Sequence, residues 1–465
     1  MSVYKVVKLH KPFDRVIEVP GSKSITNRAL LLACMSGGRC KLKGALYSDD
    51  TIHFISSLRS MGFNVEISDN GDIEVTGQGG NIPISIGSID VGSAGTAARF
   101  LTAFVGLSDC IYTVNCTDQM AKRPMKPLFD ILTSLQAQIT YLKDREHLPA
   151  KIIGATLADS LYGEATIDSE YDKDISELLS LTPAEKEKEE EVVIDVPSDM
   201  STQFLSALLM IAPVYANKVF KRVILNVTGK RGLGSYVIMT RRMMEEFGIS
   251  IECEHDEESG AVKYIIDTGH FYSRDEYEIE PDMSSASYFY AAAAITGSKV
   301  KVKGVHRNSL QGDIRFIEVL EEMGCKTEEQ PDGIVLQGSD HKLKGISINM
   351  KDFSDQSMTL AAIAPFAESN VEITGIEHIR GQESDRINGM LTELRRMGIE
   401  ADELDGGIRI KPGIPKPCKI ETYEDHRMAM AFSLPGLIVD GIEIDNPECT
   451  GKTFGNYWDK LSELY

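Results

Sequence analysis

Six segments of the sequence place polar side chains directly before an apolar run, and side chains of these types can bind anions. The segments begin near Ser22, Ser93, Met200, Met283, Asp355 and Asp425. The run that follows each of them is apolar nearly all round, so we expect a buried helix there. The first N–H groups of a helix have no partner within it, and the helix dipole adds partial positive charge. Several such ends facing one cleft predict a site for small anions.

Cationic side chains and glycines stand at the first two of these helix starts. Lys23 and Arg28 lie in residues 20–28 (PGSKSITNR), where Arg offers a fork to a carboxylate or phosphate and Lys a point charge. Gly95 lies in residues 92–99 (GSAGTAAR), and glycine lets a ligand approach the backbone closely. The alternatives are a capped helix with two surface cations and a tight strand-to-helix turn.

Further polar residues have equally simple alternatives. Arg123 is by default a solvated charge, and Lys452 lies in a loop that can reach a phosphate. Helix capping by itself accounts for the hydroxyl and amide groups of Ser201, Thr202 and Gln203.

Carboxylates and a histidine accompany arginines in the second half of the chain. Asp355 precedes the fifth apolar run, where N-capping is the alternative, and Glu383 lies three residues before Arg386. His426 lies directly before Arg427, and a buried core histidine with both ring nitrogens satisfied is the alternative there. A carboxylate flanked by cations normally has a lowered pKa. Glu383 must therefore be desolvated, or share its proton, to act as a general acid.

The composition favours a cytoplasmic protein that handles small molecules. The 465 residues include 49 Lys and Arg against 70 Asp and Glu, a net charge of −21, which argues against nucleic acid or an anionic membrane as partner. Eight cysteines occur without a C-x-x-C pair, as is typical of reduced thiols. The first residues contain no apolar signal core, and the longest apolar stretch, residues 428–439, is too short to span a bilayer.

A second pattern, a surface helix followed by a turn and two strands, repeats about every 75 residues. The turn residue after each helix is Gly62, Gly248, Gly324 or Gly398, and Gln136 takes this place in one repeat. Glycine there suits a helix C-terminus. One spacing is longer than the others, and it contains the acidic run of residues 182–191, which we predict to be a solvated loop.

The two patterns together predict an α/β fold of two similar domains with three repeats each. Every repeat then holds one buried helix, one surface helix and about four strands. The last repeat lacks a full strand set, and residues 4–8 and 15–19 are expected to complete it. The predicted domains are residues 1–20 with 281–465, and residues 21–280. We expect the active site in the cleft between them.

Ten ordered motifs resemble those of the 5-enolpyruvylshikimate-3-phosphate (EPSP) synthase family almost from end to end. They are PGSKSITNRALLLA, GSAGTAARF, KRPM, STQFLSALLM, PDMSSASYF, NSLQGDIRF, SDQSMT, ESDRI, EDHRMAMAFSL and CTGKTF. The resemblance implies two domains of three βαβαββ units with buried parallel helices. It also implies transfer of the enolpyruvyl group of phosphoenolpyruvate to the 5-hydroxyl of shikimate-3-phosphate, with release of phosphate, through a tetrahedral intermediate. Neither a metal nor an organic cofactor is implied, a monomer is expected, and glyphosate is expected to compete with the donor.

The resemblance also assigns residues. It assigns phosphoenolpyruvate to Lys23, Gly95, Arg123, Gln203, Arg386, Arg427 and Lys452. It assigns shikimate-3-phosphate to Ser24, Arg28, Ser201, Thr202, Gln203, Tyr236, Asp355 and Gln382. Our hypothesis makes Asp355 the base toward the 5-hydroxyl and Glu383 the acid and base at the methylene carbon, with Lys23 assisting.

A few positions depart from the family pattern, and they define the alternatives. Gln382 stands where Lys is usual, His378 where Asn is common, and Ser93 where Asn is common. Leu233 stands where a Ser is usual before Tyr236. A noncatalytic binder of phosphate metabolites on the same scaffold would be consistent with Gln382. The UDP-N-acetylglucosamine enolpyruvyl transferases share fold and donor but use a loop cysteine, and Cys116 is the nearest candidate here.

Overall fold

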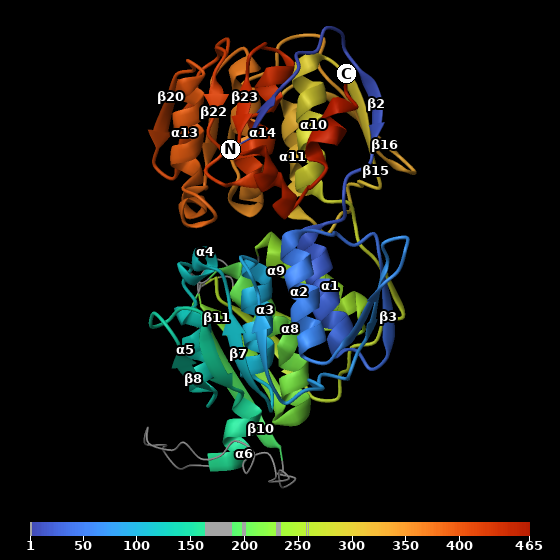
Figure 1. Cartoon of the computed structure of the whole chain (residues 1–465), viewed down its shortest axis with the longest axis vertical. Coiled ribbons are helices and arrows are strands. Elements are labelled where there is room, and N and C mark those ends of the chain that lie inside the picture. The colour runs from blue at the N-terminus through green and yellow to red at the C-terminus, as the bar shows by residue number, and fades with distance from the viewer. Residues whose placement is uncertain (1, 163–187, 198–200, 229–233, 257, 259) are drawn as a thin grey trace. The chain divides into compact units, whose positions relative to one another are not determined.

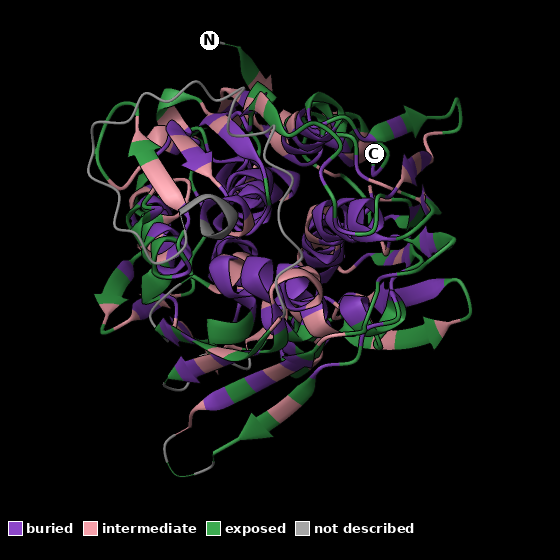
Figure 2. Cartoon of the chain, turned by 90° about the horizontal axis from the view of Figure 1, so that it is seen from below, coloured by how far each residue is buried: buried purple, intermediate pink, exposed green. Residues whose placement is uncertain are grey.

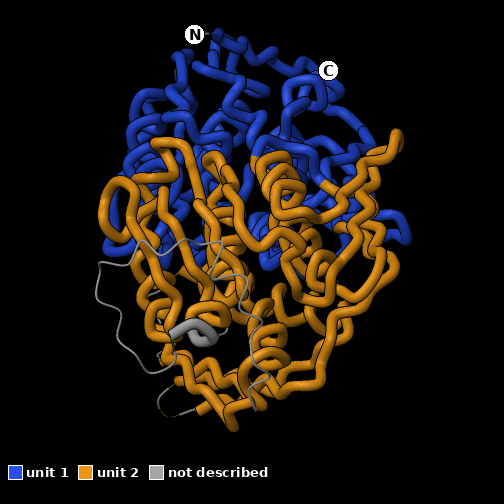
Figure 3. The backbone as a smooth tube through the Cα atoms, turned by 60° about the horizontal axis from the view of Figure 1, so that its bottom comes forward, with its two compact units in different colours: residues 1–23, 46–49, 280–465 blue, residues 24–45, 50–279 orange. Residues whose placement is uncertain are grey.

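The structure is a computed structural model of the chain (Figure 1), and it describes residues 2–162, 188–197, 201–228, 234–256, 258 and 260–465. The chain forms two compact units, shown in Figure 3. Unit 1 comprises residues 1–23, 46–49 and 280–465, and unit 2 comprises residues 24–45 and 50–279.

Unit 2 contains three four-stranded sheets with a similar order of strands. The first is β14-β3-β5-β4, formed by Glu276–Glu278, Arg39–Lys43, Ile73–Thr76 and Asn64–Ile67. The second is β6-β7-β9-β8, formed by Ile86–Asp90, Ile111–Asn115, Ala150–Ile153 and Gln138–Tyr141. The third is β10-β11-β13-β12, formed by Glu189–Pro197, Phe220–Thr228, Val262–Asp267 and Glu252–His255. In each sheet the first two strands are parallel and the remaining pairs antiparallel.

The helices of unit 2 fall into a buried and an outer set. The buried ones are α1 (Lys23–Met35), α3 (Gly95–Gly106) and α8 (Thr202–Lys218). The outer ones are α2 (Asp49–Ser60), α5 (Lys126–Ser134) and α9 (Ser235–Glu246), with the short α4 (Asp118–Ala121) and α6 (Ala155–Tyr162) beside them in the chain. Figure 2 shows helices coloured as buried over most of their length, as the apolar runs predict.

Unit 1 repeats this plan. Its sheets are β16-β17-β15-β2 (Lys326–Gln330, Gly333–Gln337, Lys299–Lys303, Asp14–Ile17), β18-β19-β21-β20 (Ser347–Asn349, Val371–Thr374, Gly407–Ile410, Ala401–Leu404) and β1-β23-β22 (Val3–Lys5, Glu443–Asp445, Lys419–Ile420). The buried helices are α10 (Met283–Thr296), α12 (Ser357–Ile363) and α14 (His426–Ala431), and the others are α11 (Phe316–Glu322), α13 (Arg386–Arg396) and α15 (Tyr457–Ser462). Short 3₁₀ helices are η1 (Gly312–Arg315), η2 (Lys351–Gln356), η3 (Ala364–Phe366), η4 (Glu377–Gly381), η5 (Leu434–Leu437) and η6 (Pro447–Lys452).

The predicted repeat is confirmed in its order and in its turns. The second repeat runs β6, α3, β7, α4, α5, β8, β9, which is a βαβαββ unit with the short helix α4 added. The four repeat glycines lie in the left-handed region, with φ of +92°, +91°, +105° and +76° for Gly62, Gly248, Gly324 and Gly398. Gln136 adopts the same conformation with φ of +76°. The turn is therefore kept even where glycine is replaced.

One strand prediction is wrong. We expected both N-terminal strands in the last sheet, and β1 does pair with β23 there, with Tyr4 opposite Ile444. However, β2 pairs in parallel with β15, while β14, which precedes α10 in the chain, pairs with β3 of unit 2. β2, which precedes α1 of unit 2 in the chain, thus lies in a sheet of unit 1. β14, which precedes α10 of unit 1, lies in a sheet of unit 2. The two segments in which the chain passes from one unit to the other are hydrogen-bonded to each other, because Asp282 N donates to Pro20 O at 2.8 Å.

The acidic run is only partly a loop. Residues 189–191 begin β10, so the loop prediction is wrong for them, while residues 182–187 lie outside the described residues. The third predicted helix start at Met200 also lies outside them, although α8 begins two residues later. Among the residues that the structure describes, no helix is long and apolar enough to cross a membrane.

Candidate active site

In unit 1 a strained turn aims polar residues at the beginning of α14. Asp425 caps this helix, accepting a hydrogen bond from Arg427 N at 3.0 Å. The two residues before it, Tyr423 and Glu424, have φ of +55° and +57°, a conformation that side chains other than glycine rarely adopt. Tyr423 is held there because its hydroxyl donates to the buried Glu393 carboxylate at 2.7 Å.

Arg386, the first residue of α13, is buried between two carboxylates. Its side chain is 2% exposed, and its Nε lies 2.8 Å from Asp425 Oδ2 while its Nη1 lies 3.0 Å from Asp355 Oδ1. Gln382 Oε1 accepts a further hydrogen bond from Nη1. Burial alone would lower the pKa of Arg386, but Asp425 and Asp355 raise it above its ordinary value. The guanidinium is therefore charged.

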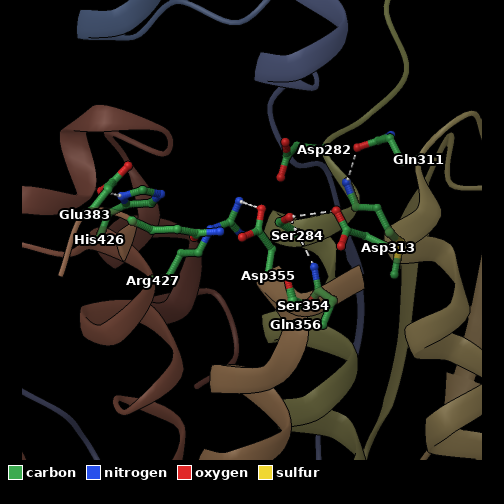
Figure 4. A network of polar contacts seen from close by, with 12 residues as sticks. Asp282, Ser284, Gln311, Asp313, Ser354, Asp355, Gln356, Glu383, His426 and Arg427 are labelled. Atoms are coloured by element: carbon green, nitrogen blue, oxygen red, sulfur yellow. Dashed lines mark hydrogen bonds and ion pairs between the residues drawn. The ribbon is translucent and has the colours of Figure 1, made fainter. Parts of the chain in front are cut away.

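Asp355 lies between two guanidinium groups. Its other oxygen, Oδ2, accepts from Arg427 Nη2 at 2.9 Å (Figure 4). Asp355 belongs to η2, and α12 has Gln356 as its N-cap residue without a side-chain hydrogen bond. The capping alternative is therefore wrong for Asp355. By contrast, Asp282 caps α10, accepting from Ser285 N at 2.7 Å.

Glu383 has polar partners of its own. Its Oε1 lies 3.1 Å from Lys452 Nζ, and its Oε2 lies 3.0 Å from His426 Nδ1. Burial would raise the pKa of Glu383, but His426, Lys452 and Lys23 lower it well below its ordinary value. Glu383 is thus desolvated, as an acid requires, yet in this arrangement it is an anion.

His426 is buried, and only one of its ring nitrogens is satisfied. Burial lowers its pKa, while Glu383 and Asp425 oppose that shift, so the ring is neutral at neutral pH. With Nδ1–H donating to Glu383, Nε2 is an acceptor, and it has no hydrogen-bond partner in the described part of the chain. The core-histidine alternative is therefore correct that His426 is buried. It is wrong that both ring nitrogens are hydrogen-bonded.

Three of these side chains also lie close enough to hold a metal ion. Glu383, Asp425 and His426 offer ligand atoms that lie within 4.8 Å of one another. However, Lys452 already pairs with Glu383 and Arg386 with Asp425. Because both carboxylates are neutralised by side-chain cations, we interpret the cluster as an ion-pair network and not as a metal site.

In unit 2, two arginines and a glutamine surround Gly95 at the start of α3. A Cβ on Gly95 would lie 2.7 Å from Arg123 Nη1, 2.9 Å from Arg99 Nη1 and 3.7 Å from Gln203 Oε1. Gln203 Oε1 accepts from Arg99 Nη1 at 2.5 Å. Burial, and then Arg123, lower the pKa of Arg99 to about 10. Arg123 is therefore not a simple surface charge, and two like charges meet at a helix N-terminus, where an anion would be stabilised.

Arg28 is a second buried arginine of unit 2. Its Nε donates to Thr240 Oγ1 at 2.8 Å, its Nη2 to Ser206 Oγ at 3.2 Å and its Nη1 to Ser24 O at 2.9 Å. It lies 5.8 Å from the centre of the Tyr236 ring, and burial lowers its pKa to about 10. Among the described residues of unit 2, no carboxylate forms an ion pair with Arg28 or with Arg99. A buried cation without an acidic partner gains most from a bound anion.

The remaining predicted residues of unit 2 lie at partly accessible positions. Ser24, Thr202, Gln203 and Tyr236 are partly exposed, and Ser201 is exposed. Ser201 also caps α8, because its Oγ accepts from Gln203 N at 3.4 Å. The capping alternative is thus confirmed for Ser201, which leaves its hydroxyl accessible.

The structure adds residues that the sequence did not single out as site residues. Arg99 and Asp425 belong to the motifs GSAGTAARF and EDHRMAMAFSL, and their contacts with Gln203 and Arg386 place them in the site. Asp313 is buried beside Asp355, and a Gly-Asp pair before a surface helix gave no sign of this.

The departures from the family pattern can be placed as well. His378 Nε2 lies 2.9 Å from Ser354 Oγ, so it holds the residue next to Asp355. Gln382 contacts Arg386. Leu233 lies outside the described residues.

The chain is similar to known proteins over nearly its whole length. A chain from Nostoc punctiforme called 3-phosphoshikimate 1-carboxyvinyltransferase is 37% identical over 465 residues, covering 100% of this chain and 99% of its own. A protein of the same name from Shewanella baltica is 37% identical over 452 residues and covers 96% of each chain.

Solved structures share the fold. An EPSP synthase from Acinetobacter baumannii has a TM-score of 0.78 at 24% identity and covers 99% of this chain and 98% of its own. The enolpyruvyl transferase NikO from Streptomyces tendae has a TM-score of 0.69 at 13% identity, covering 99% and 97%. The fold is therefore that of the enolpyruvyl transferases.

The family model for EPSP synthase (3-phosphoshikimate 1-carboxyvinyltransferase) matches residues 7–176 and 174–461. The chain belongs to the EPSP synthase family, the enolpyruvyl transferases of the shikimate pathway.

Proposed function

We propose that this chain transfers the enolpyruvyl group of phosphoenolpyruvate to the 5-hydroxyl of shikimate-3-phosphate and releases phosphate. The observation that carries the proposal is a pair of carboxylates with separate partners: Asp355 lies between two arginines, and Glu383 lies beside the cationic Lys452 and the neutral His426. The reaction needs a base for a hydroxyl and an acid for a methylene carbon, both close to anionic substrates. Two carboxyl groups in different surroundings can supply these two roles.

The donor is proposed to bind where cations converge. Its residues are Lys23, Gly95, Arg123, Gln203, Arg386, Arg427 and Lys452, with Arg99 added beside Gly95. The acceptor is proposed to bind at Ser24, Arg28, Ser201, Thr202, Gln203, Tyr236, Asp355 and Gln382. Arg28 supports this assignment because it is charged, buried and paired only with hydroxyl and carbonyl oxygens among the described residues. That both sets act on one pair of substrates, in a cleft between domains bounded at residues 20 and 280, stays a prediction.

Binding of the donor prepares both carboxylates. Its carboxylate and phosphate groups compete for Arg386 and Arg427, so Asp355 loses counter-charges and can accept a proton. The same anions neutralise Lys452 and Lys23, two of the groups that lower the pKa of Glu383. The pKa of Glu383 then rises because desolvation is no longer outweighed. Donor binding thus converts Glu383 from an anion into a general acid.

The steps balance as an addition followed by an elimination. The hydroxyl oxygen bonds to C2 of the donor, its proton goes to Asp355, and C3 takes a proton from Glu383. In the second step Glu383 takes a proton back from C3, the C2–O bond to the phosphate breaks, and the double bond returns. The proton taken from the hydroxyl leaves with the phosphate. Lys23 assists by stabilising the anionic groups beside Glu383.

Two features bear on the alternatives. Cys116 is the nearest cysteine to the loop that the UDP-N-acetylglucosamine enzymes use, and burial raises its pKa to about 11. A thiol with that pKa is protonated at neutral pH and is a poor nucleophile. Gln382 keeps a hydrogen bond with Arg386, so the change from Lys removes a charge without leaving a polar group unsatisfied.

The test is phosphate release from phosphoenolpyruvate, with shikimate-3-phosphate and UDP-N-acetylglucosamine as parallel acceptors. We expect release with shikimate-3-phosphate only. Release with the sugar nucleotide alone would overturn the proposed acceptor, and release with neither would favour a noncatalytic binder. We further propose a monomer located in the cytoplasm that glyphosate inhibits in competition with the donor.

A further inference from the structure

We propose that Asp313 is a positioning residue that holds a proton behind Asp355, so that Asp355 alone carries the negative charge of the pair. The inference rests on the proposed role of Asp355 as the base for the acceptor hydroxyl. Asp313 does not belong to the residues assigned to either substrate.

A short buried network connects the Asp313 carboxyl group with the side chain of Gln356. Asp313 lies in η1, and its Oδ2 accepts from Ser284 Oγ at 3.3 Å. Ser284 in turn accepts from Gln356 Nε2 at 3.1 Å, and Gln356 is the next residue after Asp355. In Figure 4, Asp355 lies between Arg427 on one side and Ser284 with Asp313 on the other.

This network contains an acceptor that lacks a donor. Gln356 is fully buried, contacts Asp313, and its Oε1 has no hydrogen-bond partner among the described residues. A carboxylate can only accept hydrogen bonds, whereas a protonated carboxyl group also donates one. A proton on Asp313 would place a donor in this network, in which Gln356 Oε1 is an acceptor without one.

The charges around Asp313 favour its protonated form. It faces Asp355 of η2, Asp282 at the start of α10 and Arg427 of α14. In the described part of the chain no cation forms an ion pair with Asp313, whereas Asp355, Glu383 and Asp425 each have one. Burial and then Asp355 raise the pKa of Asp313 to about 7, although Arg427 and a hydrogen bond from Gln356 oppose the shift.

The consequence is a dependence of substrate binding on pH. Below a pH of about 7 Asp313 is neutral, and above it a second negative charge develops beside Asp355. That charge repels anionic substrates. Conversely, a bound donor neutralises Arg427, which is the cation that lowers the pKa of Asp313, so Asp313 regains its proton in the complex. If binding raises this pKa by about one unit, kcat/KM falls about tenfold across the transition.

The direct test is infrared difference spectroscopy of the full chain as the pH rises from about 5 to about 9. The wild type should lose a protonated carboxyl band with a midpoint near 7, and Asp313→Asn should lack that band. Asp352→Asn is the matched control, because Asp352 lies in η2 but its side chain is 56% exposed. A band that persists in Asp313→Asn, or a wild type without a carboxyl group titrating near pH 7, would overturn the proposal.

The kinetic test separates positioning from a merely structural role. The inflection near pH 7 should appear in kcat/KM and not in kcat, because kcat reports the complex, in which Asp313 keeps its proton. Asp313→Asn should remove it, while Asp352→Asn should keep it. An inflection that survives in Asp313→Asn contradicts the proposal. The infrared measurement does not require turnover. A protein that is inactive but whose Asp313 titrates would therefore refute the proposed function, while the proposed proton on Asp313 would stand.

Discussion

Replacing Glu383 with Gln should lower kcat strongly and tighten donor binding at the same time. Gln has nearly the same shape as Glu but carries neither the charge nor the transferable proton. Lys452 Nζ lies 3.1 Å from Glu383 Oε1, so the substitution removes the anion that neutralises this lysine. General acid–base groups contribute about 10²- to 10⁴-fold to rate, and we expect kcat to fall by that factor.

The gain in donor affinity follows from the lost charge. If Glu383 stayed charged, a unit charge about 5 Å from a bound phosphate oxygen would cost about 3 kcal/mol at an effective dielectric constant of about 20. Glu383 takes up a proton instead, so donor binding bears the smaller cost of that protonation, which a neutral Gln does not require. Part of this gain is offset because the Gln amide still interacts with the cations, and we expect about 1.4 kcal/mol, or about tenfold tighter binding. Because Glu383 is only 12% exposed, solvent screening removes little of the effect.

The assay combines titration calorimetry of the donor with single-turnover phosphate release. Glu377→Gln is the matched control, because Glu377 lies nearby in the chain but is exposed. Near-normal kcat in Glu383→Gln would refute the assignment of the acid. Weaker donor binding, with kcat lost, would show instead that Glu383 holds Lys452 in place and that the electrostatic argument is wrong.

Three other substitutions test separate parts of the site. Gly95→Ala should raise the KM for phosphoenolpyruvate at least tenfold in steady-state kinetics, because the added Cβ would meet Arg123 Nη1 at 2.7 Å; an unchanged KM would place the donor elsewhere. Asp425→Asn should lower the free energy of unfolding at pH 7 by about 3 kcal/mol in chemical denaturation, because Arg386 then keeps one buried carboxylate instead of two. The pKa of Asp425 is lowered in the folded state, so the stabilisation that its charge provides is present above its unfolded pKa of about 3.9 and is lost as the pH falls toward the folded pKa. The difference in unfolding free energy between wild type and Asp425→Asn should therefore shrink in acid. A difference that grows in acid would contradict this. Gln382→Lys should lower the KM for shikimate-3-phosphate several-fold, since it adds a cation, and a raised KM would show that the contact with Arg386 matters more.

The sequence predicted the helices well because their signals are local. An apolar run behind a polar start predicts a buried helix, and α10, which begins at Met283 as expected, is an example. The turn of each repeat is also local, and even Gln136 keeps it. Strand pairing is not local: β2 lies far from β15 in sequence, and nothing in residues 15–19 distinguishes that partner from the last sheet.

The same distinction applies to the site. Motifs predicted the types of residues, and the structure brings Lys452 to Glu383 and Arg427 to Asp355. However, the sequence could not tell whether Asp355 caps a helix or pairs with arginines, since this depends on contacts between distant segments. The importance of Asp313 could not be predicted from the sequence, because it depends on burial and the surrounding Gly-Asp pair does not indicate burial.

The most direct test of the addition–elimination account is the deuterium content of the donor's methylene carbon after reaction in heavy water. C3 becomes a methyl group in the proposed intermediate, so the wild type should place solvent deuterium in both recovered phosphoenolpyruvate and product when shikimate-3-phosphate is present. Glu383→Gln should show no incorporation, while Glu377→Gln should match the wild type. Turnover without any deuterium at this carbon would contradict the account.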